Sequence, residues 1–198
     1  PAYPTPLDPE HPATFGPYMN DPDLINNKMQ LSLAMDAAHD VIRDVFAELE
    51  TMTGRPYPVL DSYRMQDAEV ATVLINSAAE TAKEAADGLR EKSQKVGVLS
   101  PNVLRPFPAA EFRRALKTVK AATVGDRADS YGAGGGNLAL EVRAALQIDP
   151  ENETLVLSRI YGLGGKDFYG ADAVAFFEEA RIAATTGKVA KPFAYYGA

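Results

Sequence analysis

A run of glycines ahead of a helical pattern is the feature of this sequence that most suggests chemistry. Residues 132–136 read Gly-Ala-Gly-Gly-Gly, and the apolar spacing of a helix begins at Asn137. Free N–H groups and the helix dipole at such a terminus attract anions, so the loop is a candidate phosphate site. The dinucleotide-binding pattern, however, needs a glycine where Asn137 stands and a position after the first strand. We therefore expect a tight turn, or a close backbone approach at an interface, involving Gly134, Gly135 and Gly136.

Three charged residues follow predicted strands at the edge where ligands usually bind in an open α/β sheet. Asp126 and Arg127 follow the predicted strand at residues 121–124, and a buried ion pair that orders the loop is the favoured interpretation. Arg105 stands in the sequence Arg-Pro-Phe-Pro, where its guanidinium can reach a carboxylate or a phosphate. For Arg105, anchoring at an interface is favoured over substrate binding.

Other catalytic and nucleotide-binding patterns are missing. The two Gly-Lys pairs are followed by Asp167 and Val189, where a P-loop requires Ser or Thr. The chain has no cysteine, which excludes disulfides, thiolate metal sites and iron–sulfur clusters held by this chain. His11 and His39 are far apart in sequence, so no histidine metal site or nucleophile–histidine pair is indicated. We expect no catalytic and no metal-binding residue in this chain.

Composition narrows the classes of partner. The 198 residues are 46% hydrophobic, enough for a packed core, and carry a net charge of -7. This acidic balance argues against nucleic acid and against an anionic membrane surface as partners. No apolar run approaches the roughly 20 residues of a membrane span, and no signal peptide is apparent. We expect a cytoplasmic protein.

The first part of the sequence predicts an arm and a long helix. Seven prolines in residues 1–22 prevent regular structure, and the aromatic residues among them favour a docked strap over a disordered tail. The strap residues are Tyr3, Phe15 and Tyr18. A helix should begin at Asp21 and Pro22 and end at Gly54. Its apolar residues alternate four and three apart, which predicts one packing stripe: Leu31, Met35, Ala38, Ile42, Val45, Leu49 and Met52.

From residue 67 onward, strands and helices alternate. Strands are predicted at 70–75, 96–99, 121–124 and 154–160, and helices at 77–92, 109–119, 137–147 and 171–185. Ser77 and Glu80 have the spacing of a capping box. This alternation predicts an α/β fold, a mostly parallel open sheet with helices on both faces. The boundaries we expect are 1–58 for the arm and linker helix, 59–186 for the α/β domain and 187–198 for a tail that docks on a neighbour or frays.

Five segments resemble pyruvate:ferredoxin oxidoreductases, in the order of that family. Residues 96–108 (VGVLSPNVLRPFP) resemble the segment after the family's second strand. Residues 124–127 (VGDR), with the glycine loop and the helix that follow, resemble its next strand, loop and helix. Residues 159–167 (RIYGLGGKD) resemble its last strand and turn, and residues 7–16 and 49–57 the connection between its first two domains.

The resemblance implies a particular part of that enzyme, the alpha-subunit domain that is similar to the C-terminal domain of transketolases. In the family, the glutamate that activates thiamine belongs to the preceding domain, and the diphosphate and Mg²⁺ site to a beta region. The 4Fe–4S clusters belong to cysteine-rich regions. The implied partners are beta, gamma and ferredoxin-like delta subunits, with coenzyme A as co-substrate and ferredoxin as electron acceptor. No catalytic or cofactor-binding residue is carried over to this chain.

Two departures from the family pattern affect this expectation. Ser100, Pro101 and Asn102 replace a short basic segment, so the loop before Arg105 is expected to be reshaped. The upstream domain of the family is absent from the sequence. The chain is therefore either a split subunit, with Pro1 following a removed initiator Met, or a part of a longer alpha subunit.

The expected function is a structural and assembly domain of an enzyme that oxidatively decarboxylates a 2-oxoacid to an acyl-CoA and reduces ferredoxin. The Arg-Pro-Phe-Pro form resembles members that act on pyruvate, and other 2-oxoacids stay open as substrates, including oxalate, 2-oxoisovalerate and an aryl glyoxylate. The alternative is a free-standing α/β module that binds a phosphorylated ligand at residues 132–136.

Overall fold

The structure, a computed structural model, describes residues 8–12 and 19–198. The chain divides into two compact units, residues 1–39 and residues 40–198. The strap predicted from Tyr3, Phe15 and Tyr18 lies outside the described residues.

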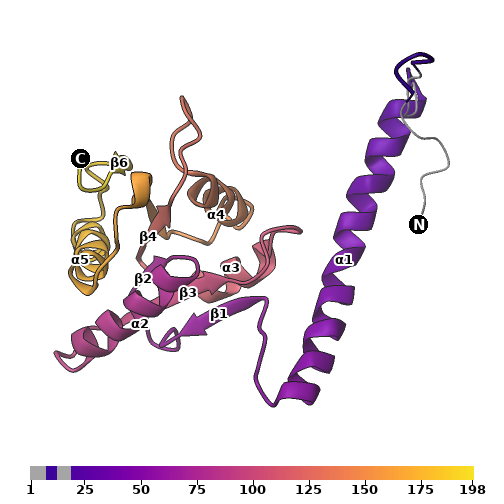
Figure 1. Ribbon diagram of the computed structural model, residues 1–198. Coiled ribbons are helices and arrows are strands. Elements are labelled where there is room, and N and C mark those ends of the chain that lie inside the picture. Colours follow the sequence, from indigo (N-terminus) through magenta and orange to yellow (C-terminus); the bar gives the residue numbers. More distant parts are fainter. Residues whose placement is uncertain (1–7, 13–18) are drawn as a thin grey trace. The chain divides into compact units, whose positions relative to one another are not determined.

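A long helix, α1 (Asp23–Thr53), begins in the first unit and ends in the second (Figure 1). It begins two residues after the predicted cap at Asp21. Gly54 ends it at a φ of 69°, and the Gly54 amide donates to the Glu50 carbonyl oxygen at 2.8 Å. A positive φ is accessible to glycine without strain, so the predicted glycine stop is confirmed. Among the described helices, none combines the length and apolar composition that a membrane span needs.

The apolar stripe of α1 is only partly covered. In the first unit, Leu31 and Met35 are exposed. In the second unit, Val45 and Met52 are also exposed, whereas the other two members of the stripe, Ile42 and Leu49, are half-buried. No residue of α1 is fully buried. An amphipathic helix normally turns its apolar side towards protein, so this exposure has to be explained by what the chain does.

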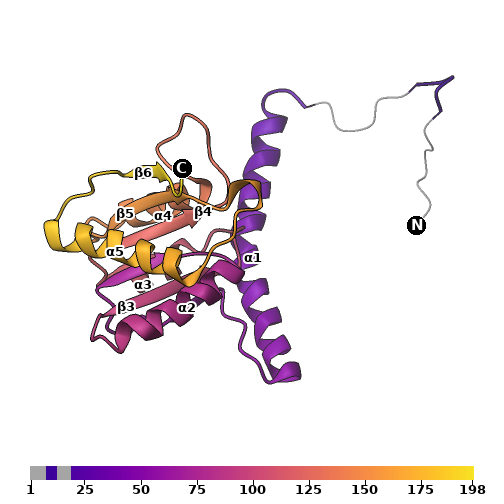
Figure 2. The ribbon, with the colours of Figure 1, turned by 60° about the vertical axis from the view of Figure 1, so that its left-hand side comes forward.

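Six strands form one sheet in the order β1-β3-β2-β4-β5-β6 (Figures 1 and 2). Strand β1 pairs antiparallel with β3, and all the other neighbours are parallel. The predicted mostly parallel sheet is therefore confirmed. The strands are β1 (Leu60–Tyr63), β2 (Val70–Val73), β3 (Val96–Pro101), β4 (Ala121–Asp126), β5 (Leu155–Ile160) and β6 (Phe193–Tyr195).

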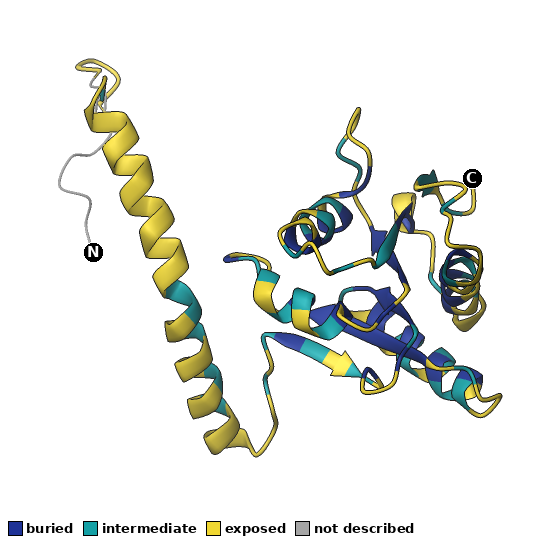
Figure 3. Cartoon of the chain, turned by 180° about the vertical axis from the view of Figure 1, so that it is seen from behind, coloured by how far each residue is buried: buried dark blue, intermediate teal, exposed yellow. Residues whose placement is uncertain are grey.

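Helices cover both faces of the sheet, as predicted. Helices α2 (Ser77–Arg90) and α5 (Gly170–Thr186) pack on one face, where Phe176 and Phe177 are fully buried. Helices α3 (Ala109–Leu116) and α4 (Asn137–Gln147) pack on the other around Phe112 and Val142. Figure 3 shows the central strands buried between helices whose outer sides are exposed. Strands β2, β3 and β4 are buried along their whole length, which explains why most of their residues are apolar.

Two local predictions are corrected. Strand β1 was not predicted because its sequence, LDSY, is mostly polar, as suits an edge strand with exposed positions. The capping box is also wrong, since Ser77 is already the first helical residue and Asn76 precedes it at a φ of 55° without a side-chain cap. Glu80 instead accepts a hydrogen bond from Lys83 at 2.7 Å.

The tail docks on its own sheet. Strand β6 pairs parallel with β5. Along the chain, the two strands are separated by the 3₁₀ turn η1 (Leu163–Gly165) and by α5. The Tyr195 hydroxyl donates to the Asp129 carboxylate. The Tyr196 ring packs edge-on against Phe176 with centroids 5.1 Å apart, and its hydroxyl donates to Asp172 Oδ1 at 2.9 Å. The tail is thus part of the domain, neither frayed nor free for a neighbour.

The substitution Tyr196→Phe should flatten the loss of stability in alkali. Burial, together with the hydrogen bond to Asp172, raises the pKa of Tyr196 to about 12, above the value of about 10 for a solvated phenol. The unfolded chain loses this proton first, so the free energy of unfolding falls as pH rises from about 10 to about 12. Urea unfolding across this range should show a shallower fall for Tyr196→Phe.

The control is Tyr131→Phe, because that side chain is 82% exposed. An identical pH dependence for Tyr196→Phe and the unsubstituted chain would contradict the role given to this hydroxyl.

Candidate functional site

The carboxyl edge of the parallel sheet gathers the charged residues that the sequence singles out. Strand β2 leads into α2 on one face, whereas its neighbours β3 and β4 lead into α3 and α4 on the other. Such a reversal opens a crevice above the strand ends, where open α/β sheets usually bind ligands. Arg105, Asp126 and Arg127 all line one hollow at this place, with a volume of about 500 Å³.

Asp126 closes the N-terminus of α4. Its carboxylate is buried, and its two oxygens accept the backbone N–H groups of Leu138 at 2.7 Å and Ala139 at 3.2 Å. Burial raises the pKa of Asp126, while the two N–H groups oppose that change because they favour the charged form. Two of the four free N–H groups at this helix end are thereby satisfied within the chain.

The ion pair predicted between Asp126 and Arg127 is wrong. The Arg127 guanidinium donates instead to the carbonyl oxygen of Gly162 at 2.9 Å. Gly162 has a φ of 66°, and a Cβ there would lie 2.9 Å from the Arg127 Nε. The loop after β4 is therefore ordered by two separate contacts, one to α4 and one to the turn after β5.

The glycine loop owes its composition to close approach inside the chain. A Cβ on Gly136 would lie 2.4 Å from an Asp126 carboxylate oxygen, and one on Gly135 would lie 2.9 Å from an Arg143 guanidinium nitrogen. Gly134, by contrast, has open space around it. A close backbone approach is found at Gly135 and Gly136, but its partners are residues of the same domain, and an approach at an interface stays a prediction.

Two residues that the sequence did not single out complete this loop. The Ser158 hydroxyl accepts the Gly136 N–H at 3.0 Å. Arg143 donates to the carbonyl oxygens of Gly134 at 2.6 Å and Pro192 at 2.8 Å, which ties the loop to the segment before β6. An arginine at this position of α4 has no distinctive sequence signal, because its partners are backbone carbonyls distant in the chain.

Arg105 lines the hollow together with Glu141. Its guanidinium donates to Glu141 Oε1 at 2.6 Å, joining the loop after β3 to α4. The pair is largely exposed, so it contributes at most about 1 kcal/mol to stability. The remaining lining is mostly apolar and comes from Ile75, Leu104, Phe107, Ala128 and Leu138, with Asn137 beside them.

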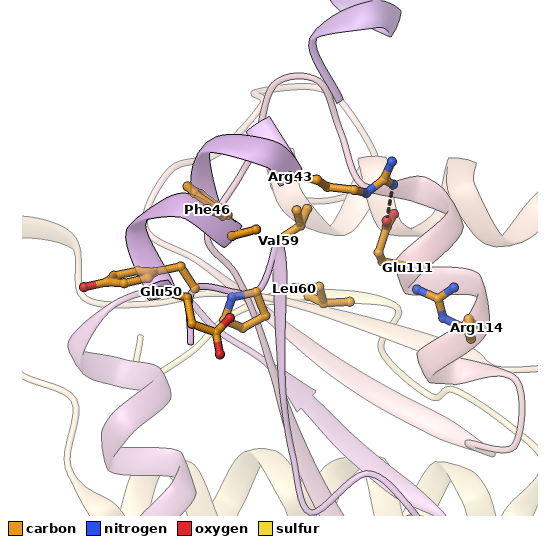
Figure 4. A pocket seen from close by; sticks show the side chains of 10 residues that line it. Arg43, Phe46, Glu50, Val59, Leu60, Glu111 and Arg114 are labelled. Atoms are coloured by element: carbon orange, nitrogen blue, oxygen red, sulfur yellow. Dashed lines mark hydrogen bonds and ion pairs between the residues drawn. The ribbon is translucent and has the colours of Figure 1, made fainter. Parts of the chain in front are cut away.

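A second hollow, of about 340 Å³, lies within the unit of residues 40–198 between the end of α1 and α3 (Figure 4). Arg43 of α1 donates to Glu111 of α3 at 2.7 Å. Phe46 lies beside Tyr57 with ring centroids 6.3 Å apart. These contacts hold the last turns of α1 to the domain, and none of the candidate residues from the sequence lies there.

Asp126 and Glu141 are the carboxylates that line the hollow at the sheet edge, and each already accepts at least one hydrogen bond within the chain. The hollow has no serine, threonine, lysine or histidine in its lining that could act as nucleophile or base. Across residues 8–12 and 19–198, no group of three or more His, Asp or Glu side chains is placed to hold a metal ion. The hollow thus combines two carboxylates and two guanidinium groups with an apolar lining.

Comparison with known proteins places these features in a family. Residues 68–173 match the family described as pyruvate:ferredoxin oxidoreductase core domain II. The pyruvate synthase subunit PorA of Thermotoga maritima is 37% identical over 180 residues, which cover 91% of this chain and 45% of that protein. PorA of Pyrococcus abyssi is 35% identical over 191 residues, 96% of this chain and 48% of that protein. The chain thus spans less than half the length of these curated relatives.

Among solved structures, a similar chain belongs to a 2-oxoglutarate:ferredoxin oxidoreductase from Magnetococcus marinus with 2-oxoglutarate, coenzyme A and succinyl-CoA bound. Its TM-score is 0.48 at 21% identity, and the match covers 73% of this chain and 23% of that chain.

The substitution Gly136→Ala should destabilise the domain while Gly134→Ala leaves it nearly unchanged. The new methyl at Gly136 meets the buried Asp126 carboxylate, and such overpacking costs about 1–3 kcal/mol. The methyl at Gly134 meets nothing within 4 Å, so its effect should stay within about 0.5 kcal/mol. Urea unfolding measures both; equal effects would contradict the close-approach account.

Proposed function

The chain belongs to the pyruvate:ferredoxin oxidoreductase core domain II family, and on that premise we propose that it is a structural and assembly domain of an alpha subunit. The enzyme is a thiamine-diphosphate-dependent 2-oxoacid:ferredoxin oxidoreductase. It oxidatively decarboxylates a 2-oxoacid, forms an acyl-CoA and passes the electrons to ferredoxin. Relatives named pyruvate synthase support pyruvate as the substrate.

The exposed apolar stripe of α1 is the observation that carries an assembly role. Four of the seven residues of this stripe are exposed, namely Leu31, Met35, Val45 and Met52. Exposed apolar patches of this kind mark interaction surfaces. The partner that covers the stripe is, in this proposal, the rest of the alpha subunit, because the chain spans less than half the length of its curated relatives. Residues 1–58 then connect that part to the α/β domain of residues 59–186.

The reacting groups lie outside this chain in the proposed enzyme. Thiamine diphosphate and Mg²⁺ belong to the preceding alpha domain and a beta subunit, and 4Fe–4S clusters to cysteine-rich partners such as a ferredoxin-like delta subunit. Coenzyme A and ferredoxin are co-substrate and electron acceptor of the complex, which also has a gamma subunit. The absence of cysteine from the sequence supports this division for the clusters, because iron–sulfur clusters are held by cysteine thiolates.

The geometry disfavours the alternative, a phosphate site at residues 132–136. The N–H groups of Leu138 and Ala139 are occupied by Asp126, and the N–H of Gly136 by Ser158. A phosphate at this helix end has to displace a carboxylate from its own chain.

The substitution Met35→Glu should prevent assembly without unfolding the chain. Met35 is exposed on the stripe, so the effect on the free energy of unfolding should stay within about 0.5 kcal/mol. Burying the new carboxylate under a partner without a counterion costs several kcal/mol, so copurification of partner subunits with the tagged chain should fall at least about tenfold.

The matched control is Ala37→Glu, which adds the same charge on the opposite side of the helix two residues later. Equal losses of partner subunits in both variants would contradict a specific role for the stripe.

Titration separates the proposal from its alternative. Thiamine diphosphate with Mg²⁺, added to the chain in a calorimeter, should give no saturable heat, and inorganic phosphate should leave the Tm unchanged. Micromolar binding of thiamine diphosphate would contradict the assignment of the cofactor to other domains. A Tm that rises with phosphate would favour the phosphate-binding module, since a ligand that binds the native state stabilises it.

A further inference from the structure

The hollow above the carboxyl end of β2 has the form of a small-molecule site. It lies between the loops that follow β3 and β4, and its volume is about 500 Å³. Small-molecule sites typically measure about 300–1,000 Å³ and combine an apolar lining with a few polar groups. The position, size and lining of the hollow thus match those of typical small-molecule sites.

Two residues of the apolar lining are fixed by packing against the core or by their position in a helix. Phe107 stacks on the fully buried Phe112, with ring centroids 5.2 Å apart and planes 2° from parallel. Leu138 is buried in the first turn of α4, where Asp126 accepts its N–H. Leu104, by contrast, is 42% exposed and presents apolar surface to the opening. The hollow therefore offers a preorganised apolar floor, which limits the entropy lost on binding.

The charged side chains that line the hollow differ in how far their hydrogen-bonding groups are already paired within the chain. Both carboxylates have partners, since Asp126 accepts two backbone N–H groups and Glu141 accepts a hydrogen bond from Arg105. Arg127 donates only to the carbonyl oxygen of Gly162, and no carboxylate pairs with it in the described part of the chain. A guanidinium has five N–H donors and stays charged, so most of the hydrogen-bonding capacity of Arg127 remains available.

We propose that this hollow binds a small carboxylate with a branched or aromatic apolar body. The carboxylate pairs with Arg127, and the body lies on Leu104, Phe107 and Leu138. Arginine suits this partner because its planar fork matches the two oxygens of a carboxylate. The proposal concerns ligand recognition by this chain alone, so it stands or fails independently of the assembly role.

Three compounds test the two halves of the proposed ligand. Benzoate has both the carboxylate and the apolar ring, benzyl alcohol keeps the ring without the charge, and inorganic phosphate has charge without the ring. Titration of the full chain, followed by calorimetry and by ligand-observed NMR, should show saturable binding of benzoate at one site. Benzyl alcohol should bind at least about tenfold more weakly because it lacks the charge that pairs with Arg127, and phosphate at least about tenfold more weakly because it lacks the apolar ring.

Two variants locate the site. Arg127→Gln should weaken benzoate binding at least about tenfold and leave benzyl alcohol unchanged, because only the charge pairing is removed. Leu104→Ser should weaken both compounds, because it removes apolar surface from the opening. Both side chains are exposed, and the free energy of unfolding of each variant, measured in urea, identifies any loss that reflects folding. The matched control is Arg55→Gln, an exposed arginine outside the hollow.

The outcomes divide clearly. The proposal is overturned if benzoate shows no saturable binding to the unsubstituted chain, or if phosphate or benzyl alcohol binds as tightly. It is also overturned if Arg127→Gln and Leu104→Ser bind benzoate like the Arg55→Gln control. Selective loss in both variants, with folding intact, supports it.

Discussion

The carboxylate of Asp126 at the N-terminus of α4 is the contact on which the carboxyl edge of the sheet depends. It joins the end of a central strand to the start of the next helix through two backbone N–H groups. A buried carboxylate is stable only when it is hydrogen-bonded, and glycine at position 136 is required because any side chain there would meet it. Ser158 accepts the N–H of Gly136 and Arg143 donates to the carbonyl oxygen of Gly134, so the glycine loop is held by contacts within its own domain.

The polar groups at the sheet edge therefore fall into two sets, those bonded within the chain and those that line the hollow. Three N–H groups at this helix end, those of Gly136, Leu138 and Ala139, are already used within the chain. Arg105 and Arg127, by contrast, line an open hollow with an apolar floor. The sheet edge therefore offers a hollow in which a ligand can bind. The exposed apolar residues of α1 offer a surface for contact with other parts of an enzyme. Both properties suit the assembly role that we propose for this member of the core domain II family.

The order of strands and helices could be predicted because parallel strands are buried on both faces and appear as short apolar runs. Helix α4 was predicted with its observed bounds, and the glycines before it indicated a close approach of the backbone. Their partner could not be predicted, since Asp126 bonds to backbone groups 12 and 13 residues away rather than to the adjacent Arg127. Strand β1 and the docking of the tail were also missed, because an edge strand with polar positions and a three-residue strand have weak patterns.

Native mass spectrometry of the complex that contains this chain at its natural abundance tests the central claim most directly. The account predicts an assembly in which this chain is accompanied by thiamine-diphosphate-binding and cysteine-rich polypeptides, with iron and sulfide in the mass of the intact complex. It also predicts that alpha-subunit sequence preceding this domain is present, on the same polypeptide or on a separate one. A single chain of 198 residues without partners, iron or cofactor would contradict the account.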